Sequence, residues 1–189
     1  MIFIIIYCLR KLDNCPMKYR IGILFTLFNL ATINGFSQSL NKVYRGGSGS
    51  DYFTKVFETK DGYDAFGITH SFGAGNRDIL FTKLDSCGEV VSSFAYGGRR
   101  GEILYGVLQK ASGNYVVLCQ TTSYSPIAVD LEQDILVFEI EPDGTLVKSS
   151  VIERSDNSRR TRERPKCLIT CRTGGYFVLC NEALISDKL

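Results

Sequence analysis

Three segments of the chain repeat the same residue types in the same order, and this repeat constrains the fold more than any other feature. The segments are KDGYDAFGITHSFG (60–73), ASGNYVVLCQTTSY (111–124) and RTGGYFVLCN (172–181). Equivalent residues lie 51 to 61 positions apart, as Asp51 to Glu102 and Tyr115 to Tyr176 show. Similarity at a fixed period is typical of repeated supersecondary units. We therefore expect units covering about 43–94, 95–151 and 152–189, the last incomplete.

Each unit has the pattern of short β-strands separated by turns. In the first unit the segments YFTKVFET, YDAFGITHS, ILFTKLD and EVVSSFAY are rich in β-branched and aromatic residues. The apolar runs VVLC (116–119) and FVLC (177–180) do not alternate with polar residues, so both faces of these strands are expected to be buried. No segment after the N-terminal region predicts an amphipathic helix, and the fold class is therefore all-β.

The turns and strand starts fall at equivalent positions in the units. Glycine and aspartate are expected there because tight turns need positive φ or a side chain that bonds the nearby backbone. The predicted structural positions are Gly46, Gly47, Asp61, Gly62, Tyr63, Asp78, Asp85, Gly88, Gly97, Gly98, Gly113, Tyr115, Asp134, Asp143, Gly144, Gly174, Gly175 and Tyr176.

The order of these motifs resembles the repeats of secreted bacterial β-propeller-like proteins. The shared pattern is Y-G-G, D-G-G-Y, S-F-G-x-G-x-x-D-I-L, K-L-D-x-x-G and a second Y-G-G, here found at 44–47, 61–63, 71–80, 83–88 and 96–98. The resemblance covers most of residues 43–181. It implies four-stranded, kelch-like propeller blades and export, often with a C-terminal sorting domain for type IX secretion, and it implies no defined reaction. The chain departs from the pattern in having no tryptophan and no sorting domain.

The number of units predicts a partial propeller. About two and a half units follow residue 37, whereas propellers close with four to eight blades. We therefore expect a truncated piece of a longer protein, with the remaining blades as its partners. One alternative is a small open β-sandwich, and another is a non-functional fragment of a truncated reading frame. The DNA sequence downstream of Leu189 would test for truncation.

Residues 1–37 predict an N-terminal extension and a signal peptide, followed by the β-repeat domain over 38–189. Translation is expected to start at Met17, where Lys18 and Arg20 precede the apolar segment 21–33. Small residues before Gln38 predict cleavage near Ser37. A single membrane anchor is the alternative, but the apolar segment is shorter than the roughly 20 residues of a spanning helix.

The charge balance does not support binding to nucleic acid. The whole chain carries 22 Lys and Arg against 20 Asp and Glu, and residues 38–189 carry 18 against 19. A nucleic-acid-binding domain is usually basic overall. The basic segment SRRTRERPK (158–166) is expected to be a solvated loop, with contact to an anionic surface or polysaccharide as the alternative.

No residue pattern predicts a catalytic centre. His70 is the only histidine, and although Ser71 follows it, adjacency in sequence does not supply the geometry of a Ser–His pair. We expect His70 to be a strand-end residue. The glycine-rich stretches 46–51 and 73–78 precede no helix, so they are interpreted as turns and not as phosphate-binding loops.

Carboxylates recur at equivalent positions and suggest two interpretations. Calcium takes carboxylate and carbonyl oxygens from loops, but each loop here supplies one carboxylate. Asp as a turn former is the preferred interpretation, and no metal or cofactor is predicted. The recurring pairs are Asp51/Glu102, Asp78/Asp134 and Asp85/Glu141.

The cysteines leave a disulfide open. A four-residue turn over 172–175 would pair Cys171 with Tyr176 and set Cys167 opposite Cys180, so a cross-strand bond between Cys167 and Cys180 is geometrically conceivable. The preferred alternative is that Cys119 and Cys180 fill a position that needs a small buried residue, as Gly67 does in the first unit.

The sequence therefore predicts a non-enzymatic, exported repeat protein that binds or scaffolds at the cell surface or outside the cell. Surface polysaccharide or protein are the expected partners, and the specific ligand is unknown. The alternative is a glycan-active propeller enzyme. It would need two carboxylates roughly 5 to 9.5 Å apart across a cleft, and Asp51, Asp78 and Asp85 are the candidates.

Overall fold

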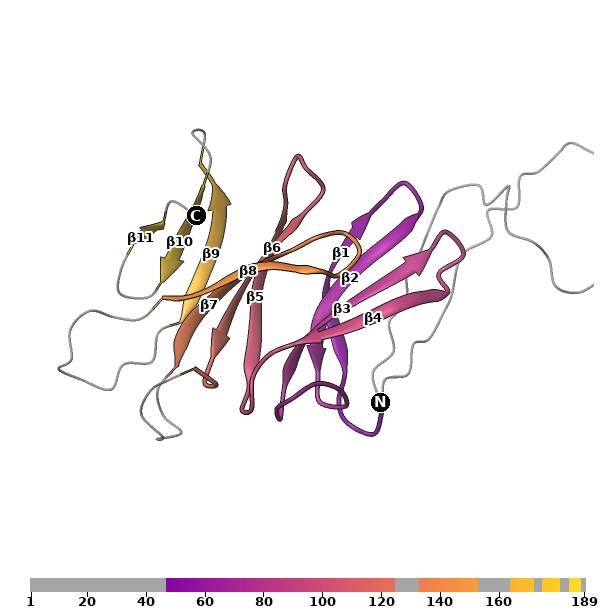
Figure 1. Cartoon of the computed structure of the whole chain (residues 1–189), viewed down its shortest axis with the longest axis horizontal. Helices are drawn as coiled ribbons and strands as arrows, with labels where there is room; N and C mark the ends of the chain where they lie inside the picture. Colours follow the sequence, from indigo (N-terminus) through magenta and orange to yellow (C-terminus); the bar gives the residue numbers. More distant parts are fainter. Residues whose placement is uncertain (1–46, 125–132, 153–163, 172–174, 181–183, 188–189) are drawn as a thin grey trace, which may run out of the picture.

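The computed structural model describes residues 47–124, 133–152, 164–171, 175–180 and 184–187 (Figure 1). The predicted signal peptide, Gly46, Gly174 and most of the basic segment 158–166 lie outside these residues. The described part of the chain is all-β, with antiparallel strands in three sheets and no helix. This confirms the all-β fold class.

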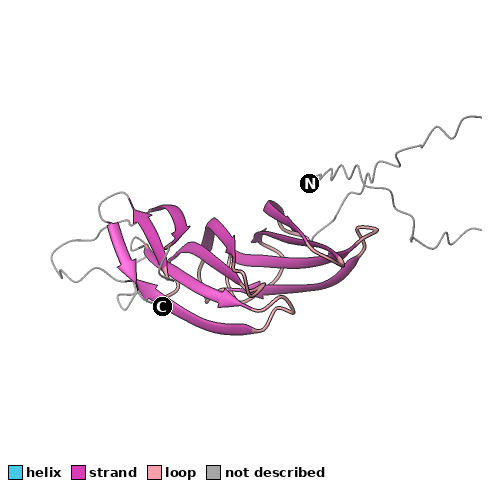
Figure 2. Cartoon of the chain, turned by 90° about the horizontal axis from the view of Figure 1, so that it is seen from above, coloured by secondary structure: helices cyan, strands magenta, loops and turns pink. Residues whose placement is uncertain are grey.

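Each sheet contains strands that are consecutive in the chain, so each is an antiparallel meander. The first sheet contains β1 (Tyr52–Glu58), β2 (Gly62–Thr69), β3 (Asp78–Asp85) and β4 (Val90–Tyr96), in that order. The second contains β5 (Glu102–Gln109), β6 (Tyr115–Thr121), β7 (Asp134–Ile140) and β8 (Leu146–Ile152). The third contains β9 (Pro165–Thr170), β10 (Tyr176–Cys180) and β11 (Leu184–Asp187). Figure 2 shows the sheets side by side along the molecule.

The three equivalent tyrosines lie at the same place in the three sheets. Tyr63, Tyr115 and Tyr176 each stand at the start of the second strand of a sheet, directly after its first hairpin turn. Tyr63 pairs with Leu84 of β3, and Tyr115 pairs with Ile140 of β7, so the register is also equivalent. The first two sheets therefore share strand order and register, and the third sheet has its tyrosine at the same place.

The hairpin turns use the residues that the sequence places there. Glycines with positive φ stand in five of them, at Gly62, Gly88, Gly113, Gly144 and Gly175. Asp85 Oδ1 accepts hydrogen bonds from the backbone N–H groups of Cys87 and Glu89, both at 2.8 Å. Asp143 Oδ1 accepts one from Thr145 N at 2.8 Å. These carboxylates bond the turn backbone in the way that favours Asp in such bends.

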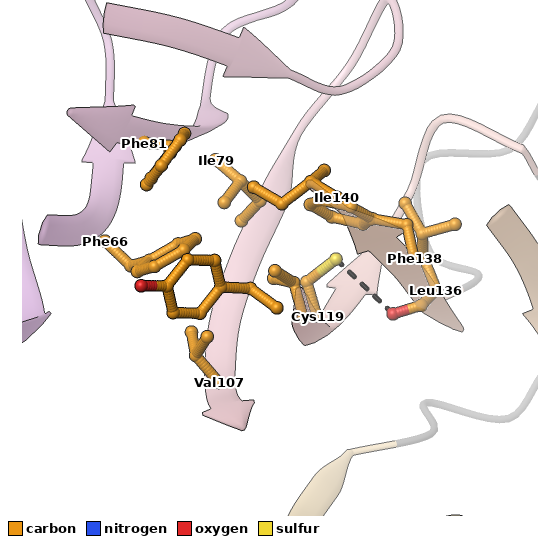
Figure 3. Close-up of a cluster of buried hydrophobic side chains, with 10 residues drawn as sticks. Phe66, Ile79, Phe81, Val107, Cys119, Leu136, Phe138 and Ile140 are labelled. Atoms are coloured by element: carbon orange, nitrogen blue, oxygen red, sulfur yellow. Dashed lines mark hydrogen bonds between the residues drawn. The ribbon is translucent and has the colours of Figure 1, made fainter. Parts of the chain in front are cut away.

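The sheets pack face to face through two apolar cores. The first core lies between the first and second sheets, where the rings of Phe66 and Phe81 stack with centroids 4.7 Å apart (Figure 3). Tyr115 of the second sheet lies against them, 4.9 Å from the Phe66 ring. The second core joins the second and third sheets and contains Val116, Leu118, Ile135, Val137, Leu168, Tyr176 and Val178.

The two non-alternating runs have different surroundings. In β6, Val117 and Cys119 face the first sheet while Val116 and Leu118 face the third, so the expected burial on both faces is confirmed. In β10 the expectation is wrong for Leu179, which is 46% exposed. It lies on the face of the third sheet that no other described sheet covers.

The register of the third sheet corrects the disulfide hypothesis. Cys167 pairs with Leu179, and Cys180 pairs with Pro165 across a bulge. Thr170, not Cys171, stands opposite Tyr176. This one-residue shift turns the thiols of Cys167 and Cys180 away from each other, because successive side chains point to opposite faces. Cys167 is a free thiol, and the buried Cys119 donates its S–H to Leu136 O at 3.4 Å (Figure 3).

Candidate functional site

Polar side chains gather at the end of the sheets where β1 and β5 begin and β2 and β6 end. In an antiparallel meander the start of one strand lies beside the end of the next, so these residues lie at the same end of each sheet. We call Asp51, Thr69 and Ser71 the first carboxylate–hydroxyl cluster. The second comprises Glu102, Thr121 and Ser123, which are the equivalent residues one unit later.

The first carboxylate–hydroxyl cluster fixes the start of β1 to the end of β2. Asp51 Oδ1 accepts hydrogen bonds from Thr69 Oγ1 at 2.6 Å and from the backbone N–H groups of His70 and Ser71 at 3.0 and 3.2 Å. Ser71 Oγ donates to Asp51 Oδ2 at 2.7 Å. Partial burial raises the pKa of Asp51, but these bonds outweigh it and hold the pKa below its usual range.

The second carboxylate–hydroxyl cluster repeats this arrangement around a fully buried carboxyl group. Thr121 Oγ1 donates to Glu102 Oε1 at 2.8 Å, and the N–H of Gly98 donates to Oε2 at 3.2 Å. The hydroxyl of Ser123 also bonds this carboxyl group. Here burial dominates: it raises the pKa of Glu102 despite these bonds, and the charge of nearby Asp78 raises it further.

The sequence aligned these residues but did not show that they touch. Asp51 was matched with Glu102, and Thr69 and Ser71 with Thr121 and Ser123, only as equivalent positions. The contact could have been predicted by pairing the two strands as a hairpin, because a hairpin places the first residue of one strand beside the last residue of the next.

The structure does not assemble a Ser–His pair. The hydroxyl of Ser71 donates to Asp51, and its oxygen accepts the N–H of Gly49 at 2.9 Å. His70 is exposed just after β2, and it is the backbone N–H of His70 that donates to Asp51. Ser71 therefore acts as a loop-fixing residue here.

A second set of polar contacts lies at the opposite end of the sheets, and the sequence analysis missed it. Tyr115 donates its hydroxyl to Asp64 Oδ2 at 2.8 Å, and Lys83 Nζ lies 2.8 Å from Asp64 Oδ1. Gln109 Nε2 donates to the same tyrosine oxygen at 3.0 Å. Burial raises the pKa of Tyr115 far above its usual value, and the contact with Asp64 adds to this. Asp64 thereby connects the first sheet to the second.

The second sheet has a matching carboxylate, Glu139, although it lies on the third strand instead of the second. Lys110 Nζ and Asn114 Nδ2 bond its Oε1 at 2.8 and 2.9 Å, and Lys148 Nζ lies 3.7 Å from Oε2. Glu139 also borders, with Tyr176, a hollow between the second and third sheets that encloses about 10 Å³, the space of about one water molecule and far less than a ligand pocket.

The three carboxylates proposed for glycan hydrolysis lie in different surroundings. Asp51 is held by the first carboxylate–hydroxyl cluster, and Asp78 is buried at the start of β3. Asp85 lies at the other end of the same strand, where it bonds its own turn. Asp134 begins β7 as Asp78 begins β3, and Glu141 directly follows β7. Within the described residues no group of three or more Asp, Glu, His or Cys side chains could hold a metal ion.

Exposed aromatic side chains occur next to both carboxylate–hydroxyl clusters. Phe72 directly follows Ser71 and is 52% exposed, and Tyr124 directly follows Ser123 and is 45% exposed. Each ring lies beside a glycine: a Cβ on Gly47 would be 3.7 Å from Phe72 Cζ, and one on Gly98 would be 3.5 Å from Tyr124 Cζ. The repeat therefore presents an aromatic ring at the same place in successive sheets.

Comparison with known protein families, curated proteins and solved structures finds no match for this chain. No helix among the described residues is long and apolar enough to cross a membrane.

Proposed function

We propose that this chain is an exported β-repeat protein whose sheets are blades of a partial propeller, and that it binds or scaffolds at the cell surface or outside the cell. The aromatic rings next to the carboxylate–hydroxyl clusters form its binding face, and a surface polysaccharide is the preferred ligand class.

The blade interpretation is supported by the equivalent contacts between successive sheets. Tyr115 of the second sheet packs on Phe66 of the first, and Tyr176 of the third packs in the core with Val116 and Val137 of the second. The first strands of successive units, β5 and β9, contact each other. Propeller blades are four-stranded meanders arranged radially, with contacts of this repeated kind.

The binding proposal rests on one observation: Phe72 and Tyr124 are exposed at equivalent loop positions, directly after serines that are fixed by carboxylates. Binding residues are often on loops that a rigid scaffold positions. An aromatic ring offers a flat apolar face with a negative electrostatic surface, on which the C–H face of a sugar ring can lie. Two such rings in successive units suit a ligand that itself repeats.

A glycan microarray tests the binding proposal. The purified chain is expected to bind a subset of the immobilised polysaccharides, and the double variant F72A/Y124A is expected to lose at least tenfold in binding. The variant Y105A is the matched control, because Tyr105 is 37% exposed but lies within β5. Equal binding by the wild type and F72A/Y124A contradicts the proposed face.

Export is tested separately in a bacterial host. We expect the chain that leaves the cytoplasm to begin at Gln38 by mass spectrometry, and deletion of residues 18–37 to retain it in the cytoplasm. A full-length N-terminus on the exported chain contradicts cleavage near Ser37.

A further inference from the structure

Two fully buried carboxyl groups, Asp78 and Glu102, meet at the junction between the first and second sheets. Asp78 begins β3 and Glu102 begins β5, and neither residue has solvent-exposed surface. The backbone holds the two strand starts together, because Glu102 N donates to Arg77 O at 3.0 Å beside the parallel bridge between Arg77 and Gly101. A bond between these carboxyl groups would therefore join two sheets.

Gly97 shows how close the two carboxyl groups are. A Cβ added to Gly97 would lie 1.9 Å from Asp78 Oδ1 and 2.3 Å from Glu102 Oε2. Both oxygens thus face the same small space, and a side chain at position 97 would collide with them. Position 97 therefore needs glycine for steric reasons. The hydrogen bond to Glu102 comes from the backbone N–H of the next residue, Gly98.

The hydrogen-bond donors are divided unequally between the two groups. Glu102 accepts bonds on both oxygens, from Thr121 Oγ1 and from Gly98 N. Asp78 accepts one bond on Oδ2, from Gly75 N at 3.1 Å. Its other oxygen, Oδ1, is buried and receives no hydrogen bond from the described residues. An unsatisfied buried oxygen of this kind destabilises the folded state.

Charge repulsion adds to that cost. Two carboxylates in one buried site cannot both ionise without a large penalty, and such a pair takes up one proton that both groups share. A proton shared between Asp78 Oδ1 and Glu102 Oε2 removes one charge and gives Oδ1 the hydrogen bond that it lacks.

We propose that Asp78 and Glu102 form a proton-sharing carboxyl pair that locks the first sheet to the second. The lock is independent of the polysaccharide-binding role. It makes the junction between the sheets respond to pH: the sheets are held most firmly when the pair is protonated, and the junction weakens when the proton leaves.

The surrounding titratable groups do not replace this proton. Burial and the charge of Glu102 raise the pKa of the Cys119 thiol well above its usual value, and burial and the same charge raise that of Tyr124. Both groups stay neutral at acid and neutral pH. Asp51 is engaged with Thr69 and Ser71, and the Arg77 side chain lies over Gly101, with Nε 3.7 Å from the place of a Cβ there. No described cation forms an ion pair with Asp78 or Glu102.

The pH dependence of stability tests the proposal. The folded pair holds its proton more tightly than the unfolded chain does. Its contribution to the free energy of unfolding is therefore fully present below about pH 4.5, the ordinary pKa of Glu, and is lost as the pH rises through the folded pKa. Urea unfolding of the full chain, followed by tyrosine fluorescence, should show an unfolding constant that increases by up to about tenfold per pH unit over this rise.

The variant D78N mimics the protonated acid, since its Nδ2–H₂ donates permanently where Oδ1 stood. It is expected to fold, to match the wild type at acid pH and to lose the decline in stability above pH about 4.5. D51N is the matched control, because Asp51 is the equivalent of Glu102 without a carboxyl partner of this kind, and it should keep the decline.

An infrared measurement keeps the proposal testable if a variant folds poorly. The wild type and D51N should show the carbonyl band of a protonated carboxylic acid at neutral pH, and D78N should lack it. Two results overturn the proposal: a decline that D78N shares with the wild type, or stabilisation of the wild type but not D78N by Ca²⁺ or Na⁺. The second result would identify the pair as a cation site.

Discussion

At the scale of single residues, the same type of contact is used twice under opposite electrostatic conditions. Asp51 is half-exposed and its pKa lies below the usual range, whereas Glu102 is buried and its pKa lies above. Both accept bonds from a threonine and a serine hydroxyl. Solvent access therefore decides which protonation state the cluster favours, although the donors are alike.

Asp51 is expected to make the protein sensitive to acid. Its lowered pKa means that the folded chain favours the carboxylate, so its contribution is present above about pH 3.8, its ordinary pKa, and is lost as the pH falls through the folded pKa. The variant D51N should be less stable than the wild type at neutral pH and should lose less stability below pH about 4. Urea unfolding at both pH values measures this. A D51N protein as stable as the wild type at neutral pH would contradict it.

Tyr115 is expected to contribute through its hydroxyl as well as its ring. The variant Y115F keeps the ring between Phe57, Phe66 and Phe81 but removes the bond to Asp64 Oδ2. A hydrogen bond to a charged group contributes about 1.5 to 3 kcal/mol, so the free energy of unfolding should fall by that amount. Y105F, at an exposed tyrosine, should change it by less than about 0.5 kcal/mol. Equal effects of the two variants would show that the Asp64 bond does not stabilise the fold.

At the scale of strands and turns, the sequence predicts the structure well where the signal is local. The turns at Gly62, Gly88, Gly113 and Gly144 are readable because positive φ restricts the choice of residue. The residue that pairs with Cys167 could not be predicted from the sequence, because the register of a hairpin depends on the geometry of its turn. A shift of one residue reverses the face of every side chain. The contacts of Asp64 with Lys83 and Tyr115 were missed because they join different strands and sheets.

Alanine substitution in two turns with the same backbone conformation separates the cost of local strain from the cost of a steric clash with a neighbouring sheet. Gly113 and Gly144 have φ of 96° and 94°, so alanine at either should cost about 1 to 2 kcal/mol through the left-handed conformation. A Cβ on Gly113 would be 3.5 Å from Pro142 Cγ, an ordinary contact, whereas one on Gly144 would lie 2.5 Å from Phe94 Cε2 on the neighbouring sheet. G144A should therefore destabilise the chain by more than G113A in thermal unfolding. Equal losses would show that Phe94 moves aside freely.

At the scale of the whole molecule, the second sheet uses one face to pack against the first sheet and the other to pack against the third. This could be expected from the repeat but not located, because packing between sheets depends on side chains far apart in the sequence. Phe66 and Leu118 occupy equivalent positions, and both are buried by the sheet that follows. The third equivalent is Leu179, which is exposed.

The exposed face of the third sheet is expected to bind a second copy of this chain. Leu179 and Ile169 are 46% and 53% exposed, and Phe177 pairs with Ile169 on the same face. The equivalent faces of the first and second sheets are covered by the sheet that follows. Contiguous apolar surface of this kind marks an interaction site. Sedimentation should show self-association of the wild type, and L179E or I169E should shift it to the monomer. V91E is the matched control, because Val91 is 65% exposed on β4, away from this face, and it should leave association unchanged. Two results would rule out this face as the contact: a wild type that stays monomeric at high concentration, or an I169E variant that associates as the wild type does.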